Sequence, residues 1–225
     1  MNFLISFFDI NNIFFTAFSY HMSYLEFFGT IFTIWCVWLT AKAKILSWPI
    51  GLVGVVLYLF LFYQIQLYSD LAEQVYFLIT GIWGWWIWVH PKTPKETKEN
   101  TELKISVNSL KENIAYGIII ALGTVLLTYV TSNLNLWLPA YFPQPAAYPF
   151  FDALTTAMSL TAQWLLAKKK IENWVLWIGV DAIDVWIYWF KGVKFVSLEY
   201  GLFFFIASIG LIKWIKERRG YAKSG

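Results

Sequence analysis

Seven apolar segments constrain this chain more than any other feature of its sequence. Each has about the 20 residues that an α-helix needs to cross the hydrocarbon core of a bilayer. Only 14% of the residues are charged, against about 25% in an ordinary soluble domain. We therefore expect an all-α integral membrane protein with seven transmembrane helices and no separate soluble domain. The predicted helices are residues 25–41, 48–67, 71–90, 113–131, 150–167, 174–190 and 197–214.

The basic residues sort by the side of the membrane on which each segment would end. If the segments cross alternately, all but two of the 17 Lys and Arg residues fall on one side, and only Lys191 and Lys194 fall on the other. Positive charge near helix ends stays in the cytoplasm, so the sequence predicts an outer N-terminus and an inner C-terminus. The basic residues are dispersed over several short stretches, and we expect no nucleic-acid partner.

The chain matches itself without a gap when it is shifted by 126 residues. This shift places Trp48 on Trp174 and Glu73 on Glu199. Each matching unit contains three spans and the fourth span stands alone between them, which gives a 3+1+3 plan. The fifth span starts on the same side as the first, so the repeats are parallel, and such transporters bind substrate near the midplane between the repeats. Further matches are Lys42 with Lys168, Gly84 with Gly210 and Trp88 with Trp214.

This plan divides the chain into six regions. The N-terminal region is expected to lie at the outer membrane surface as an interfacial helix or a loop, because polar residues break its apolar run. The regions are an outer-face segment 1–24, repeat 1 at 25–90, a cytoplasmic linker 91–112, the linking helix and outer loop 113–149, repeat 2 at 150–214 and a basic cytoplasmic tail 215–225.

Polar residues follow one face of the sixth predicted span. An ionised Asp at the centre of a lipid-facing helix costs about 2.5–3.5 kcal/mol, so this face must meet protein or water and is a functional candidate. An ion pair, a packing contact and a proton or cation relay are all open for its carboxylates. The residues share a face because helical neighbours recur every three or four positions: Trp177, Asp181, Asp184, Tyr188 and Lys191. Trp186 lies on the opposite face.

A second polar set lies in the second, third and seventh spans. Gln64 is near the outer end of the second span, together with Tyr58 deeper in it. Gln74 lies in the third span beside Glu73, and the repeat places Tyr200 at the position that corresponds to Gln74. These residues extend the candidate binding site.

Nothing in the sequence suggests a catalytic centre. The single cysteine, Cys36, cannot form a disulfide or a thiolate metal site within the chain. The motifs HExxH and GxSxG are absent. We therefore expect no enzyme, no metal and no cofactor, and a structural membrane protein is the alternative to a transporter.

Several segments resemble the PnuC family of nicotinamide riboside transporters. The resemblance is carried by LYSDLAEQVY at 67–76, GWWIW at 84–88, ENWVLW at 172–177 and SLEY at 197–200. It implies a SWEET-like fold, vitamin B3 uptake across the bacterial cytoplasmic membrane by facilitated diffusion with alternating access, and a homo-oligomer, with a trimer expected. It also implies that Asn173, Trp174 and Trp177 help to form the site.

The residues suit such a substrate. Nicotinamide riboside has a cationic pyridinium ring, a carboxamide and ribose hydroxyls. A tryptophan face attracts the cation by up to about 2 kcal/mol when desolvated, Asn and Gln side chains can pair with a carboxamide, and Asp181 or Asp184 can neutralise the charge. The predicted spans contain no arginine, which favours a riboside over its phosphate. The alternative is an ion-coupled carrier of a related vitamin such as thiamine or riboflavin.

Overall fold

A computed structural model describes residues 7–17, 20–65, 68–90, 103–142, 145, 147–192 and 194–221. In this part of the chain each predicted segment forms a long helix. Ser23 caps the first helix by accepting a hydrogen bond from the Glu26 N–H, and Ser109 with Glu112 forms a capping box at the fourth. The helices are α2 (Tyr24–Ala41), α3 (Ser47–Gln64), α4 (Tyr68–Val89), α6 (Leu110–Trp137), α7 (Pro149–Ala167), α8 (Glu172–Phe190) and α9 (Lys194–Tyr221).

Four of these helices, α2, α3, α6 and α9, are long and apolar enough to cross a membrane by composition alone. The other three carry carboxylates within the helix: Asp70 and Glu73 in α4, Asp152 in α7, and Asp181 with its neighbours in α8. The three helices that are less apolar therefore supply the candidates Gln74, Asp181 and Asp184, whereas Tyr58, Gln64 and Tyr200 come from the apolar helices α3 and α9.

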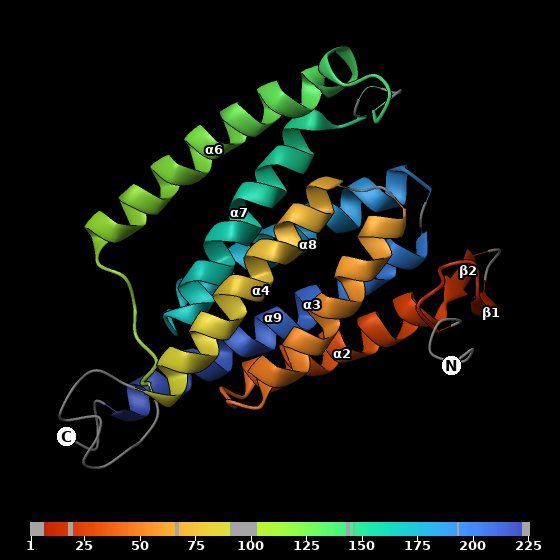
Figure 1. The fold of residues 1–225 in the computed structure, drawn as a ribbon. Coiled ribbons are helices and arrows are strands. Elements are labelled where there is room, and N and C mark those ends of the chain that lie inside the picture. Colours follow the sequence, from red (N-terminus) through yellow and green to blue (C-terminus); the bar gives the residue numbers. More distant parts are fainter. Residues whose placement is uncertain are drawn as a thin grey trace.

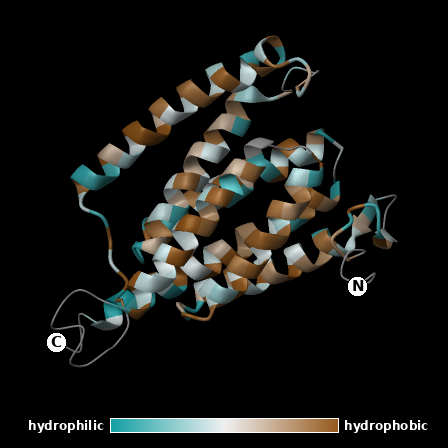
Figure 2. Cartoon of the chain, in the orientation of Figure 1, coloured by the Kyte–Doolittle hydropathy of each residue, from teal (hydrophilic) through white to brown (hydrophobic). Residues whose placement is uncertain are grey.

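Helices α2, α3 and α4 pack consecutively, and so do α7, α8 and α9. The two groups meet where α4 packs on α7 and where α2 packs on α9. Helix α6 packs mainly on α7 and stands away from the rest of the bundle (Figure 1). Apolar residues follow α6 along most of its length, with hydrophilic residues at its ends (Figure 2).

The bundle has two chemically different ends. We call one the hairpin end, because β1 (Ile13–Ala17) and β2 (Tyr20–Ser23) lie there beside the start of α2. The other is the basic end, where α2, α4, α7 and α9 finish. Lys191 and Lys194 lie at the hairpin end. The basic end holds the described basic residues Lys42, Lys44, Lys104, Lys111, Lys168, Lys169, Lys170, Lys213, Lys216, Arg218 and Arg219. Lys92, Lys95, Lys98 and Lys223 lie outside the described residues.

The N-terminal region differs from the expected interfacial helix or loop. Residues 13–17 and 20–23 pair as an antiparallel hairpin, with Phe15 opposite Met22. The aromatic and β-branched residues of IFFTA favour a strand, and Phe14 packs against Phe27 of α2 with ring centroids 4.7 Å apart. The described part of this region is therefore a hairpin docked on the bundle.

Local structures recur at positions 126 residues apart. Trp48 meets Trp88 edge to face with centroids 5.2 Å apart, and Trp174 meets Trp214 in the same way at 5.5 Å. Lys42 lies 4.6 Å from the ring of Trp38, and Lys168 lies 4.6 Å from the ring of Trp164. The left-handed backbone positions also correspond: Ala43 with φ 52° and Lys169 with φ 55°. The sequence matches thus correspond to matching local geometry.

Candidate functional site

The polar face of α8 is turned into the bundle. Asp181 is 4% exposed and Asp184 is 7% exposed, while Trp177 and Tyr188 are half-buried. Trp186, on the opposite face, is 45% exposed and packs against Phe151 at the start of α7. The amphipathic pattern of this helix therefore orients the carboxylates toward protein, as its spacing predicts.

Asp184 belongs to a group of carboxylates from three helices. It lies within electrostatic range of Asp152 of α7 and of Lys191 at its own helix end, and Glu73 of α4 interacts with both Asp184 and Asp70. We call Asp70, Glu73, Asp152 and Asp184 the acidic group. Lys191 forms an ion pair with Asp152, with 3.5 Å between Nζ and Oδ1. Among the described residues, the acidic group forms no other ion pair.

Tyrosines connect this group to the last helix. The rings of Tyr188 and Tyr200 are stacked with centroids 5.4 Å apart and an interplanar angle of 14°, which joins α8 to α9. The Lys191 ammonium lies 5.4 Å from the centre of the Tyr188 ring. The predicted residues Asp181, Asp184, Tyr188 and Tyr200 are thus brought together in the half of the bundle nearer the hairpin end.

A second polar network joins α2, α3 and α9. The Thr30 hydroxyl and the Tyr58 hydroxyl lie 2.9 Å apart, and Thr30 also hydrogen-bonds to the carboxylate of Glu199. The polar pattern of the predicted spans includes Tyr58 among the candidates but does not indicate its partners Thr30 and Glu199. The internal repeat could have indicated these partners. A shift of 126 residues places Thr30, Tyr58 and Glu199 on Thr156, Asp184 and Glu73. The network and part of the acidic group therefore occupy corresponding positions.

Glu26 extends this network to the hairpin. The Tyr20 hydroxyl donates a short hydrogen bond to the Glu26 carboxylate, and the Tyr20 ring stacks on Phe195 of α9 with centroids 5.5 Å apart. Burial, followed by the hydrogen bond to Glu26, raises the pKa of Tyr20 well above its usual value. Tyr20 is therefore a neutral donor that fixes the hairpin on the start of α9.

Asn173 and Trp174 lie in another part of the molecule, at the basic end. Asn173 is fully buried, and its amide nitrogen donates to the Lys170 carbonyl. The Asn173 Oδ1 and the Trp174 Nε1 are buried without a partner among the described residues. Asn173 and Tyr188 are about 22 Å apart along α8, at about 1.5 Å per residue. One small molecule cannot contact both ends of the predicted set at once.

The two glutamines of the predicted site, Gln64 and Gln74, lie in different surroundings. Gln64 donates from Nε2 to the Phe8 carbonyl at 2.7 Å and accepts from the Ile10 N–H, so it holds the N-terminal segment. Gln74 is half-buried in α4, the helix that carries Glu73. Trp177 lies between the two regions, with its ring 6.3 Å from that of Phe77 in α4.

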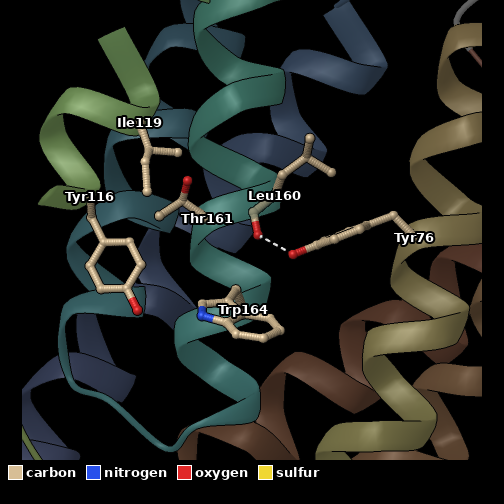
Figure 3. Close-up of a pocket in the computed structure, with 6 residues that line it drawn as sticks. All are labelled: Tyr76, Tyr116, Ile119, Leu160, Thr161 and Trp164. Atoms are coloured by element: carbon tan, nitrogen blue, oxygen red, sulfur yellow. Dashed lines mark hydrogen bonds between the residues drawn. The ribbon is translucent and has the colours of Figure 1, made fainter. Parts of the chain in front are cut away.

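A pocket of about 230 Å³ opens between α4, α6 and α7. Its lining consists of Tyr76, Tyr116, Ile119, Leu160, Thr161 and Trp164, and the Tyr76 hydroxyl donates to the Leu160 carbonyl across it at 2.9 Å (Figure 3). No residue of the predicted site lines this pocket. In the described part of the chain, no three His, Cys, Asp or Glu residues are placed to hold a metal ion.

The sequence of this chain matches the model of a known protein family. Residues 23–216 match the family model described as nicotinamide mononucleotide transporter. The chain belongs to this family. It is therefore a membrane transporter rather than an enzyme, and a multi-pass protein of the bacterial cytoplasmic membrane.

Individual relatives cover most of the chain. The nicotinamide riboside transporter PnuC of Escherichia coli is 35% identical over 216 residues, which cover 89% of this chain and 88% of that protein. The riboflavin/roseoflavin transporter RibM of Streptomyces davaonensis is 22% identical and covers 93% of each chain. A crystal structure of the vitamin B3 transporter PnuC has the same fold, with a TM-score of 0.63, 23% identity and coverage of 86% of this chain and 81% of that one.

Proposed function

We propose that this protein takes up nicotinamide riboside. The observation that carries the proposal is the 35% identity, over nearly its whole length, to a transporter of that substrate. The site chemistry agrees with it. Four carboxylates from three helices form the acidic group, and three of them, Asp70, Asp152 and Asp184, interact with one described lysine, Lys191. An excess of negative charge over positive charge favours a cation. The pyridinium ring of the riboside is a permanent cation.

The acidic group also argues against a phosphorylated substrate. A phosphate bound near Asp152 and Asp184 would experience like-charge repulsion, and phosphate sites normally contain Arg or Lys. Arginine occurs in this chain only at 218 and 219, at the far end of α9 in the basic end. The riboside fits this distribution of charge better than the mononucleotide.

Within the predicted set, we propose that Trp177, Asp181, Asp184, Tyr188 and Tyr200 form the central site. Trp177 supplies an aromatic face, Asp184 the compensating charge, and the stacked tyrosines hydroxyl groups for the ribose. Gln74 offers an amide for the carboxamide. Asn173 and Trp174 would meet the substrate at a second position along its path, where the Asn173 Oδ1, which has no partner in the described part of the chain, can accept a hydrogen bond. Gln64 would act only at the entrance.

We propose that the chain consists of two parallel three-helix repeats joined by α6, with the hairpin end outside the cell. The recurrence of the tryptophan pairs and of the left-handed residues at matching positions supports the repeats. The concentration of basic residues at one end supports the orientation. Transport then proceeds by alternating access, as facilitated diffusion down the substrate gradient, with one repeat moving against the other.

A second candidate is an ion-coupled carrier of a related vitamin. The similarity to RibM raises riboflavin as a substrate, and buried carboxylates can carry a coupling proton. The higher identity to nicotinamide riboside transporters favours the riboside. Titration of the purified protein with nicotinamide riboside, its mononucleotide, thiamine and riboflavin tests the choice. Tightest binding of the riboside is expected, and tighter binding of riboflavin or thiamine would overturn the assignment.

Energetic coupling is tested separately in proteoliposomes. Facilitated diffusion predicts that the riboside equilibrates across the membrane and that collapsing the proton and sodium gradients leaves the initial rate unchanged. Accumulation above equilibrium that disappears with either gradient would support the ion-coupled alternative.

A further inference from the structure

Four tryptophans form a continuous row across the basic end. Trp48 contacts Trp88, Trp88 lies 6.0 Å from Trp214, and Trp214 contacts Trp174. Trp88, Trp174 and Trp214 are almost completely inaccessible to solvent, and Trp48 is also buried. The outer two rings come from α3 and α8, and the central two come from α4 and α9. The row therefore spans both three-helix groups.

Within the described part of the chain, only the central two indoles donate a hydrogen bond. The Trp88 Nε1–H donates to the Ala167 carbonyl of α7 at 3.1 Å, and the Trp214 Nε1–H donates to the Thr40 carbonyl of α2 at 3.0 Å. Each bond crosses from one three-helix group to the other. Carbonyls in the last turn of a helix lack their regular intrahelical partner, so these acceptors are available to an incoming donor.

Each of the two hydrogen bonds lies at one of the contacts between the two three-helix groups. One joins α4 to α7 and the other joins α9 to α2, which are the two most extensive helix contacts between the groups. Both acceptor carbonyls lie in the last turns of their helices, Trp88 lies in the last turn of α4, and Trp214 lies about two turns before the end of α9. A separation of the groups at the basic end breaks both bonds, whereas a separation at the hairpin end can leave them intact.

We propose that Trp88 and Trp214 are a pair of latches that hold the basic end closed. They position the two groups for transport, and both hydrogen bonds break when the path opens at that end. The proposal rests on the transport function inferred above, but not on which vitamin is carried. Breaking either bond in a buried setting leaves the indole N–H without its acceptor, although the Thr40 carbonyl keeps the hydrogen bond from the Ala43 N–H. The latches therefore bias the protein toward closure at the basic end.

Trp48 and Trp174 provide a matched control. They belong to the same row, occupy corresponding positions 126 residues apart and are also buried, but their Nε1 atoms have no partner among the described residues. Replacement by phenylalanine removes a latch at Trp88 and Trp214. At Trp48 and Trp174 the same replacement removes ring volume but no hydrogen bond. A role confined to core packing predicts equal effects of the two double variants.

The test measures distances at both ends of the molecule without substrate. In a background with Cys36→Ser, spin labels at Lys44 and Arg218 report on the α2 and α9 ends, and labels at His90 and Lys168 report on the α4 and α7 ends. A third pair at Tyr63 and Lys194 reports on the hairpin end. Pulsed electron resonance in lipid nanodiscs then gives the fraction of molecules with long distances at each end.

The double variant W88F/W214F is expected to raise the ratio of open to closed molecules at the basic end by roughly fivefold for each lost hydrogen bond, or about 25-fold for the two, without lengthening the distance at the hairpin pair. W48F/W174F is expected to leave the basic-end distances as in the parent. Equal shifts in both double variants, or no shift in W88F/W214F, would overturn the latch. The single variants provide the same test if the double variant does not fold: W214F alone and W88F alone should each raise the fraction of long distances for both basic-end pairs, by less than the double variant, whereas W48F and W174F alone should not.

The distance measurement is independent of the cargo. If the protein fails to bind nicotinamide riboside but W88F/W214F still opens the basic end, the substrate assignment fails and the latch stands. If the riboside binds and the distances do not change, the latch fails and the substrate assignment stands.

Discussion

Asp184 is the residue whose surroundings best fit recognition of a cation. It is buried, it faces Asp152 and Glu73 from neighbouring helices, and the nearest described lysine is already paired with Asp152. Asp184→Asn should weaken binding of the cationic riboside by roughly 1.5–3 kcal/mol, the range for hydrogen bonds to charged groups. A neutral isosteric riboside should lose less. Calorimetric titration of both ligands measures the difference, with Glu217→Gln, an exposed carboxylate at the basic end, as the control.

The same substitution distinguishes substrate recognition from ion coupling. If Asp184 or Asp181 carries a coupling proton, the Asn variants should lose accumulation but keep nearly normal equilibrium binding. A variant with both residues changed to Asn that binds and transports like the parent would remove both roles and leave the two carboxylates as packing groups.

The two faces of α8 make a matched pair of aromatic tests. Trp177→Ala should weaken riboside binding by more than about 1 kcal/mol, because a desolvated ring that stacks on the cation is lost. Trp186→Ala should have a much smaller effect, since its ring packs on Phe151 and faces away from the acidic group. Equal losses of affinity for the two variants would mean that the substrate does not lie on the polar face of this helix.

At this scale the sequence could predict which face of α8 is polar, because the positions of Asp181, Asp184 and Tyr188 follow from helical spacing alone. It could not predict that Glu199 hydrogen-bonds to Thr30, because that contact depends on how α9 crosses α2. The predicted set of binding residues also included both Asn173 and Tyr188, although the rise of α8 separates them by about 22 Å. A shared helix face does not imply a shared site.

At the level of helices, two glycines allow α4 and α9 to approach their tryptophan neighbours. A Cβ atom added at Gly84 would overlap the Trp48 ring, and one added at Gly210 would lie 2.8 Å from the Trp174 ring. Gly84→Ala and Gly210→Ala should each destabilise the protein by about 1–3 kcal/mol, the usual cost of overpacking. Unfolding in detergent measures the effect. Gly117→Ala and Gly201→Ala, where nothing lies within 4 Å of the added atom, should be neutral or stabilising.

Helix bounds followed from hydropathy to within a few residues at most ends, because the length of a membrane span is set by the bilayer. The larger differences are at α6 and α9, which continue to Trp137 and Tyr221, beyond the apolar segment, where hydropathy gives no signal for a helix that extends into water. The hairpin at 13–23 was missed for a related reason. An apolar run broken by Asp9 and Asn11 suggests surface placement, but pairing of two strands depends on register, which a count of apolar residues does not contain.

For the whole molecule, the distribution of the lysines predicts which end of the bundle faces the cytoplasm, and the structure identifies exposed positions at both ends at which to test it. Lys44 is exposed at the basic end and Tyr141 is exposed in the loop after α6, on the opposite side of the bundle. If the basic end is cytoplasmic, then in a Cys36→Ser background Lys44→Cys should react with a membrane-impermeant thiol reagent only in inverted vesicles. Tyr141→Cys should react only in intact cells.

Three described helices, α3, α4 and α6, lie between the two labelled positions. If all three cross the membrane, the labels must fall on opposite sides. If one of them lay on the membrane surface instead, the labels would fall on the same side. Labelling of both from one side would contradict the seven-span plan, and with it the argument that the repeats are parallel. Labelling on opposite sides but in the reverse order would keep the plan and invert the orientation, so that Trp88 and Trp214 would close the outer end of the path instead of the inner one.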